Sequence, residues 1–179
     1  MYGVVLFAHV CALLVAISAG ALSHFSESRM RSAETTAAVR PWAKVLGRLG
    51  KVFPVALLVL LASGAYLVHD AWSWSAGWVD ASLVGVGLLF ASGGGLVRAR
   101  GVALRRALMA AGEGPLPAEV RRLIVRHPAA FASWMNTGLA VGIVFTMTEK
   151  PALGGSAAAL VVGAAAGLAV AVGAARRHA

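Results

Sequence analysis

One histidine, His9, lies well inside the first long apolar stretch of the chain. On a helix that starts near Tyr2 it would lie roughly 10 Å along the axis, a depth at which ionisable side chains are rare and usually functional. Helical spacing puts it on the same face as Ala12 and Ala16, so it should face protein and not lipid. A neutral imidazole there could bind a haem iron or another metal, handle a proton, or form a hydrogen bond as a packing residue. The sequence leaves these interpretations open.

His69 is the second candidate ligand, because it closes the second apolar stretch on the side of the membrane predicted for His9. A haem in that half of the bilayer could be held by both imidazoles, so His9 and His69 are the candidate cofactor and metal ligands. The alternative for His69 is an interfacial residue beside Trp72, Trp74 and Trp78. Because no Cys-x-x-Cys-His motif occurs, a bound haem would be a non-covalent b-type haem.

The motifs of several common enzyme chemistries do not occur in the chain. There is no Walker-type phosphate loop, no His-Glu-x-x-His zinc motif and no nucleophile elbow. The single cysteine, Cys11, rules out an intramolecular disulfide. The sequence therefore identifies no catalytic residue and leaves enzyme activity open.

The elements that must position these histidines are apolar helices. Hydrophobic residues make up 59% of the 179 residues and charged residues only 13%, whereas about a quarter of a soluble domain is charged. The apolar residues gather in stretches long enough for a helix to cross roughly 30 Å of hydrocarbon. The sequence predicts an all-α, polytopic membrane helix bundle that forms a single domain over 1–179 in a lipid bilayer. Its five spans are expected near 2–22, 52–68, 81–97, 129–148 and 152–175.

Lys and Arg are distributed unevenly between the connections. Fifteen of the 16 fall on one side of the five-span arrangement, in the connections 23–51 and 98–127 and in the tail, and only Lys150 falls on the other. Cytoplasmic loops carry such an excess, so we expect the N-terminus outside and the C-terminus in the cytoplasm. Because the basic residues lie in these connections, the net charge of +9 does not predict a nucleic-acid partner. The first connection is expected to contain a helix that begins near Pro41.

Small residues in the last two spans predict close helix packing. Lipid gives helices no hydrophobic drive to associate, so residues that permit close backbone approach mark the contact faces. These are Gly138 and Gly142 in the fourth span and Gly155, Gly163 and Gly167 in the fifth. The partner helix could belong to this chain, to a second copy in a homo-oligomer, or to another membrane subunit.

Several short motifs resemble known membrane protein families. Leu6-Phe7-Ala8-His9, Arg48-Leu49-Gly50-Lys51-Val52-Phe53-Pro54, Leu61-Ala62-Ser63-Gly64, Gly114-Pro115-Leu116-Pro117-Ala118-Glu119 and Thr148-Glu149-Lys150-Pro151 resemble a bacterial family of predicted integral membrane proteins of unknown function. More distantly, the His-led first span is similar to the membrane-bound haem-containing protoporphyrinogen oxidase family and to the copper-resistance D family. The resemblance implies a multi-pass protein of the bacterial cytoplasmic membrane, with His9 matching the oxidase family's first-span histidine. That family's later-span lysine has no counterpart in spans 81–97 and 129–148.

Two classes of function follow from these patterns. In the first, His9 ligates a b-type haem or a related tetrapyrrole in the outer half of the bundle. In the second, the chain is a non-enzymatic accessory or structural subunit, and its Gly/Ala-rich helices pack against a larger membrane complex.

Overall fold

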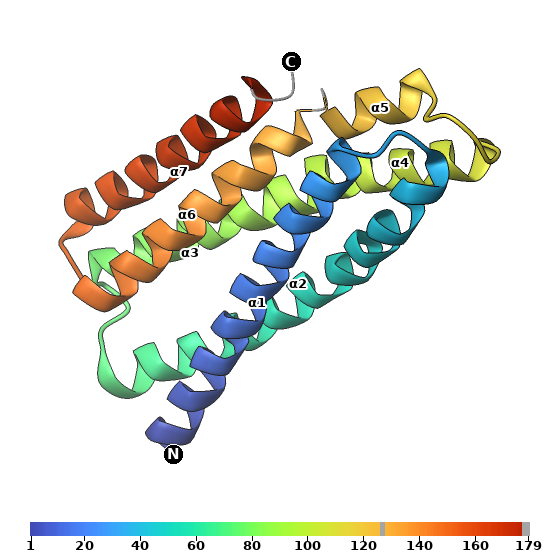
Figure 1. Ribbon diagram of the computed structural model, residues 1–179. Helices are drawn as coiled ribbons and strands as arrows, with labels where there is room; N and C mark the ends of the chain where they lie inside the picture. The colour runs from blue at the N-terminus through green and yellow to red at the C-terminus, as the bar shows by residue number, and fades with distance from the viewer. Residues whose placement is uncertain (126–127, 177–179) are drawn as a thin grey trace. The chain divides into compact units, whose positions relative to one another are not determined.

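The computed structural model describes residues 1–125 and 128–176, and nearly all of them are helical (Figure 1). In chain order the helices are α1 (Tyr2–Arg31), α2 (Thr36–Ala71), α3 (Gly77–Ser92), the π-helical η1 (Gly93–Val97), α4 (Arg98–Ala110), α5 (Ala118–Val125), α6 (Ala129–Glu149) and α7 (Leu153–Arg176). The predicted all-α fold class is confirmed. Arg126, His127, Arg177 and His178, which belong to the predicted second connection and tail, lie outside the described residues.

Five helical segments are long and apolar enough to cross a membrane, as the sequence predicts. They are Tyr2–Arg31, Thr36–Ala71, Gly77–Ala110, Ala118–Glu149 and Leu153–Arg176; residues 126 and 127, within the fourth, lie outside the described residues. These segments extend beyond the predicted spans, because the chain stays helical through much of the basic connections. The bundle of five apolar helices is compatible with a lipid bilayer as its surroundings.

The second helix begins earlier than the expected start at Pro41. Thr35 lies before its first turn in an extended conformation, and its side chain accepts a hydrogen bond from the Ala38 backbone N–H at 3.3 Å. Such a cap satisfies one of the amide groups that a helix start leaves without a partner. Pro41 and Pro54 therefore both lie inside α2.

The contacts divide the chain into two compact units. The first comprises Met1–Trp74 with Gly112–Leu116, and the second comprises Ser75–Ala111 with Pro117–Ala179.

In the first unit α1 and α2 run antiparallel. His9 contacts Ser63 toward one end, and Phe25 packs edge-on against Trp42 toward the other, with ring centroids 5.5 Å apart. Small residues that are buried along this contact, Ala12, Ala19 and Ala56, allow the two helices to approach closely.

The short segment 112–116 is fastened to the start of α2. The Thr36 hydroxyl, which is fully buried, donates to the Gly112 carbonyl at 2.9 Å. The Leu116 backbone N–H donates to the Glu34 carbonyl at 2.8 Å. Between them Gly114 has a φ of 141°, a backbone angle that residues with a Cβ rarely adopt. The Gly-Pro-rich stretch that breaks the helical pattern thus has its own hydrogen bonds.

The second unit is built around α3, α6 and α7. Its apolar core contains Ala81, Leu139, Ile143 and Leu160. Lys150, with a φ of 50°, makes the left-handed turn that ends α6 before α7 begins. The short helix α5 is held to α4 by Arg100, which donates from Nε to the Leu123 carbonyl at 2.9 Å and from Nη2 to the Ile124 carbonyl at 3.1 Å.

Candidate functional site

His9 lies on the face of α1 that packs on α2. Its side chain is half-buried, and its Nδ1 lies 2.9 Å from the hydroxyl oxygen of Ser63, which is 8% exposed. The ring also lies over the next residue of α2: a Cβ added at Gly64 would meet His9 Cε1 at 3.4 Å. The prediction that His9 faces protein is confirmed. A serine and a glycine one position apart thus make the site that receives the imidazole.

The hydrogen bonds of Ser63 determine which ring nitrogen of His9 carries the proton. The Ser63 hydroxyl donates its only hydrogen within its own helix, to the Val59 carbonyl and more weakly to the Leu60 carbonyl. With its hydrogen on the Val59 carbonyl, the Ser63 oxygen accepts from His9, and this arrangement has the proton on Nδ1. The neutral ring then carries its lone pair on Nε2. This is the tautomer in which a histidine binds metal through Nε2 while a second group orients the ring.

His69 is not brought beside His9. It lies in the last turn of α2, six residues beyond Ser63, with an exposed side chain. Six residues advance a helix by about 9 Å and turn it by about 240°, so His69 points to another side of α2 than Ser63 does. The first unit therefore presents one imidazole at the level of His9.

The site offers one imidazole, that of His9, as a ligand. Among the described residues there is no group of three or more His, Cys, Asp or Glu side chains that could hold a metal ion. A haem already supplies four nitrogen ligands to its iron, so the protein needs to give only one or two axial ligands. A single imidazole such as that of His9 could serve as one such axial ligand.

Ser63 is the residue of this site that sequence reasoning missed. It is visible in the stretch Leu61-Ala62-Ser63-Gly64, but a serine in an apolar helix usually bonds to its own backbone. Its contact with His9 depends on the register between α1 and α2, which hydropathy does not determine.

Four of the five predicted packing glycines lie where α6 and α7 meet. A Cβ added at Gly163 would lie 2.4 Å from the Gly138 carbonyl oxygen, and one at Gly167 would lie 2.2 Å from the Trp134 carbonyl oxygen. A Cβ added at Gly138 would meet the Gly163 carbonyl oxygen, and one at Gly142 would meet the Ala159 carbonyl oxygen at 2.7 Å. These glycines therefore pack helices of the same chain against each other. Gly155 differs, because its added Cβ would meet only the Pro151 side chain, at 3.0 Å.

Comparison of the chain with protein-family models, with curated proteins and with solved structures finds no match.

Proposed function

We propose that this chain is an integral protein of the bacterial cytoplasmic membrane that crosses the bilayer five times, with its N-terminus outside and its C-terminus in the cytoplasm. The five long apolar helices support the number of spans. The division of Lys and Arg, fifteen against one, supports the orientation. On this topology His9 and His69 both belong to the outer half of the protein.

Within this membrane protein, we propose that His9 binds the iron of a non-covalent b-type haem or a related tetrapyrrole through Nε2. The observation that carries the proposal is the hydrogen bond between His9 Nδ1 and Ser63 Oγ, since it orients the ring and leaves Nε2 as the basic nitrogen. When bound, such a group would supply a redox-active iron. Ser63 would hold the imidazole in place, and Gly64 would leave room for the ring against α2.

His69 remains the proposed second ligand. Its exposed side chain lies on another side of α2 than Ser63, so this part of the proposal has weaker geometric support than His9 has. A haem held by His9 alone would be five-coordinate, and one held by both histidines would be six-coordinate.

An accessory or structural subunit is the second candidate function. One observation favours it: a Cβ added at Gly87 of α3 or at Gly94 of η1 would meet no heavy atom within 4 Å. Small residues with open space beside them could receive a helix of another subunit or of a second copy. The Gly-rich contact of α6 with α7, in contrast, is already used within the chain.

Purification from cells that have an ample haem supply tests the haem proposal. We expect wild-type protein in detergent to show a Soret band and about one haem per chain. His69→Ala should convert a six-coordinate spectrum to a five-coordinate one if His69 is the second ligand, and should leave the spectrum unchanged otherwise. Wild-type protein without chromophore or metal would exclude the haem function and leave the accessory function.

A further inference from the structure

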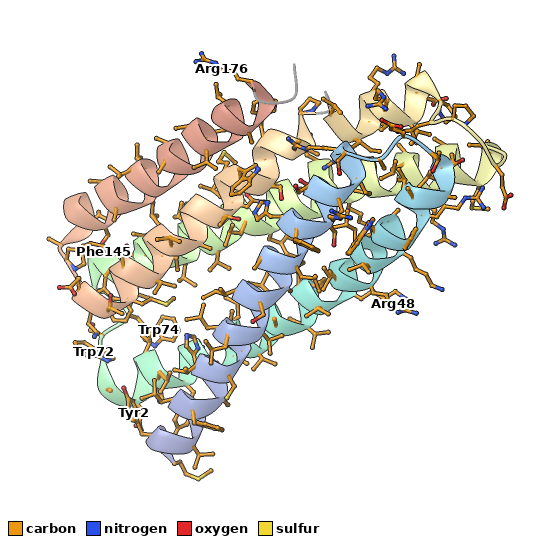
Figure 2. The ribbon with its side chains drawn as sticks, viewed as in Figure 1. Tyr2, Arg48, Trp72, Trp74, Phe145 and Arg176 are labelled. Atoms are coloured by element: carbon orange, nitrogen blue, oxygen red, sulfur yellow. The ribbon has the colours of Figure 1, made fainter. Side chains whose placement is uncertain are left out.

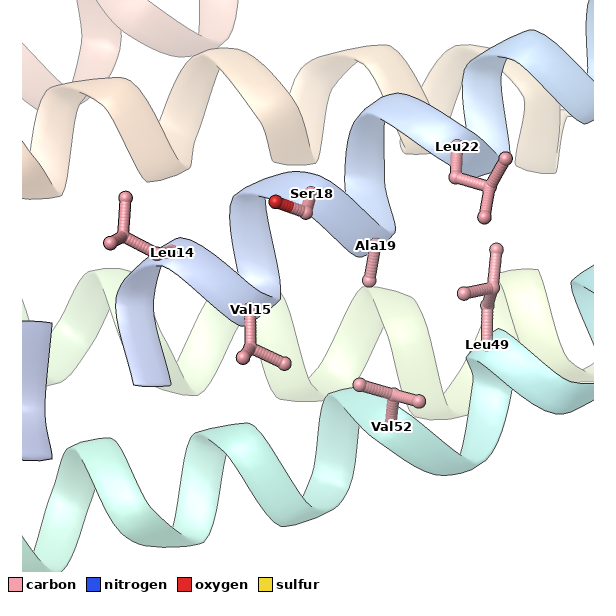
Figure 3. Close-up of a pocket in the computed structure, with 7 residues that line it drawn as sticks. All are labelled: Leu14, Val15, Ser18, Ala19, Leu22, Leu49 and Val52. Atoms are coloured by element: carbon pink, nitrogen blue, oxygen red, sulfur yellow. The ribbon is translucent and has the colours of Figure 1, made fainter. Parts of the chain in front are cut away.

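A groove runs between α1 and α2 in the first unit (Figure 3). It has a volume of about 370 Å³, and all but one of its lining residues are apolar. Leu14, Val15, Ser18, Ala19 and Leu22 line it from α1, and Leu49 and Val52 line it from α2. Leu22 and Leu49 point toward each other across it (Figure 3). The groove is open, since Leu14 and Leu22 remain 57% and 42% exposed.

Basic side chains lie directly beside the α2 wall of this groove. Arg48 precedes Leu49, Lys51 precedes Val52, and both cations are exposed. Figure 2 shows Arg48 projecting away from α2. Lys44, Arg48 and Lys51 form one helical stripe, which continues toward the helix centre as the exposed apolar residues Val55 and Leu58. The stripe therefore changes from charged to apolar alongside the groove.

Aromatic residues mark the basic end of the same two helices. Trp42 packs against Phe25, and the Arg29 guanidinium lies over the Trp42 ring at 6.0 Å from its centroid. Tryptophan beside Arg and Lys is typical of the headgroup level of a membrane. This end of the α1–α2 pair thus has the chemistry of a bilayer interface, and the groove extends from it toward the apolar part of the helices.

We infer that this groove binds one anionic phospholipid, with an acyl chain along Leu14–Leu22 and the phosphate on Arg48 and Lys51. The inference rests on the membrane location proposed above and is independent of haem binding. Charge complementarity identifies the occupant, because α2 has no Asp or Glu before Asp70 and a phosphate would supply the missing negative charge.

Lipid titration of the purified protein, followed by native mass spectrometry, tests this site. Phosphatidylglycerol should bind more tightly than phosphatidylcholine with identical acyl chains. The double variant Arg48→Gln/Lys51→Gln should bind phosphatidylglycerol roughly ten- to thirty-fold more weakly and lose the preference, because each basic residue near an anionic headgroup contributes about fivefold. Arg105→Gln/Arg106→Gln removes the same charge from exposed positions of α4 and should keep the preference.

A groove-filling variant tests the acyl-chain half of the inference. Ser18→Phe should weaken binding of both lipids, since its ring would occupy the groove. The inference fails if wild-type protein binds both lipids equally, or if the α4 variant loses as much preference as the α2 variant. It also fails if Ser18→Phe leaves phosphatidylglycerol binding unchanged.

Discussion

At the scale of single residues, Ser63 orders the hydrogen bonds around His9. When its one hydroxyl hydrogen is donated to the backbone of α2, the imidazole donates to the Ser63 oxygen from Nδ1. Which ring nitrogen of His9 carries the proton therefore depends on the alignment of α1 with α2 and not on His9 alone.

Removing the Ser63 hydroxyl should weaken haem binding without abolishing it. We expect Ser63→Ala to lower haem affinity by about 10- to 100-fold, because the ring would lose the bond that orients it and raises the basicity of Nε2. Haem titration of the apoprotein measures this change. Ser23→Ala is the matched control, since the Ser23 hydroxyl bonds only to the Ala19 carbonyl of its own helix. Equal affinities for the two variants would exclude an orienting role for Ser63.

At the scale of elements, hydropathy predicts the five long helices but not where their connections are helical. The apolar stretches are long and nearly free of charge, so their helical state and approximate limits follow from composition. The early start of α2 depends on Thr35, a single capping residue within a polar stretch. Sequence patterns do not predict the contact of His9 with Ser63 or the helix that the glycines pack against. Both depend on how two helices align with each other, which the pattern within one helix does not contain. Gly163 was predicted to pack tightly, but only the structure identifies Gly138 as its neighbour.

Even the smallest substitution, glycine to alanine, should destabilise the protein at the glycines between α6 and α7. Gly163→Ala should lower stability by about 1–3 kcal/mol, because its Cβ would lie 2.4 Å from the Gly138 carbonyl oxygen. Gly173→Ala in the same helix meets nothing within 4 Å and should be neutral or stabilising by up to about 1 kcal/mol. Thermal unfolding in detergent compares the two variants. A Gly163→Ala protein as stable as Gly173→Ala would mean that α6 and α7 are not in close contact.

The short helix α5 should depend on Arg100 of α4. Arg100→Met removes the donors to the Leu123 and Ile124 carbonyls and should cost about 2–3 kcal/mol, since hydrogen bonds from a charged group are stronger than neutral ones. Hydrogen exchange should then become faster in Ala118–Val125. Arg105→Met, at an exposed position of the same helix, should leave the exchange rate of α5 unchanged.

At the scale of the whole molecule, the charge distribution makes the topology testable apart from any ligand. In the five-span arrangement, fifteen of the 16 Lys and Arg residues fall on one side of the membrane. In a four-span arrangement the basic C-terminal tail would move to the other side, and the Lys and Arg residues would no longer be concentrated on one side to this extent. A fluorescent reporter fused to the C-terminus should therefore be active in the cytoplasm, and an alkaline phosphatase fusion at the same position should be inactive. Active phosphatase at the C-terminus would contradict the five-span arrangement.

The most direct test of haem binding by His9 is the Soret absorbance of His9→Ala. Wild-type protein and the variant are expressed with the same haem supply, recovered from the membrane fraction and compared in one detergent. We expect His9→Ala to insert normally but to have no Soret band, because the imidazole that Ser63 orients is lost. His24→Ala, which changes another histidine of α1, should keep the band. A Soret band of wild-type intensity in His9→Ala would show that His9 is not the haem ligand.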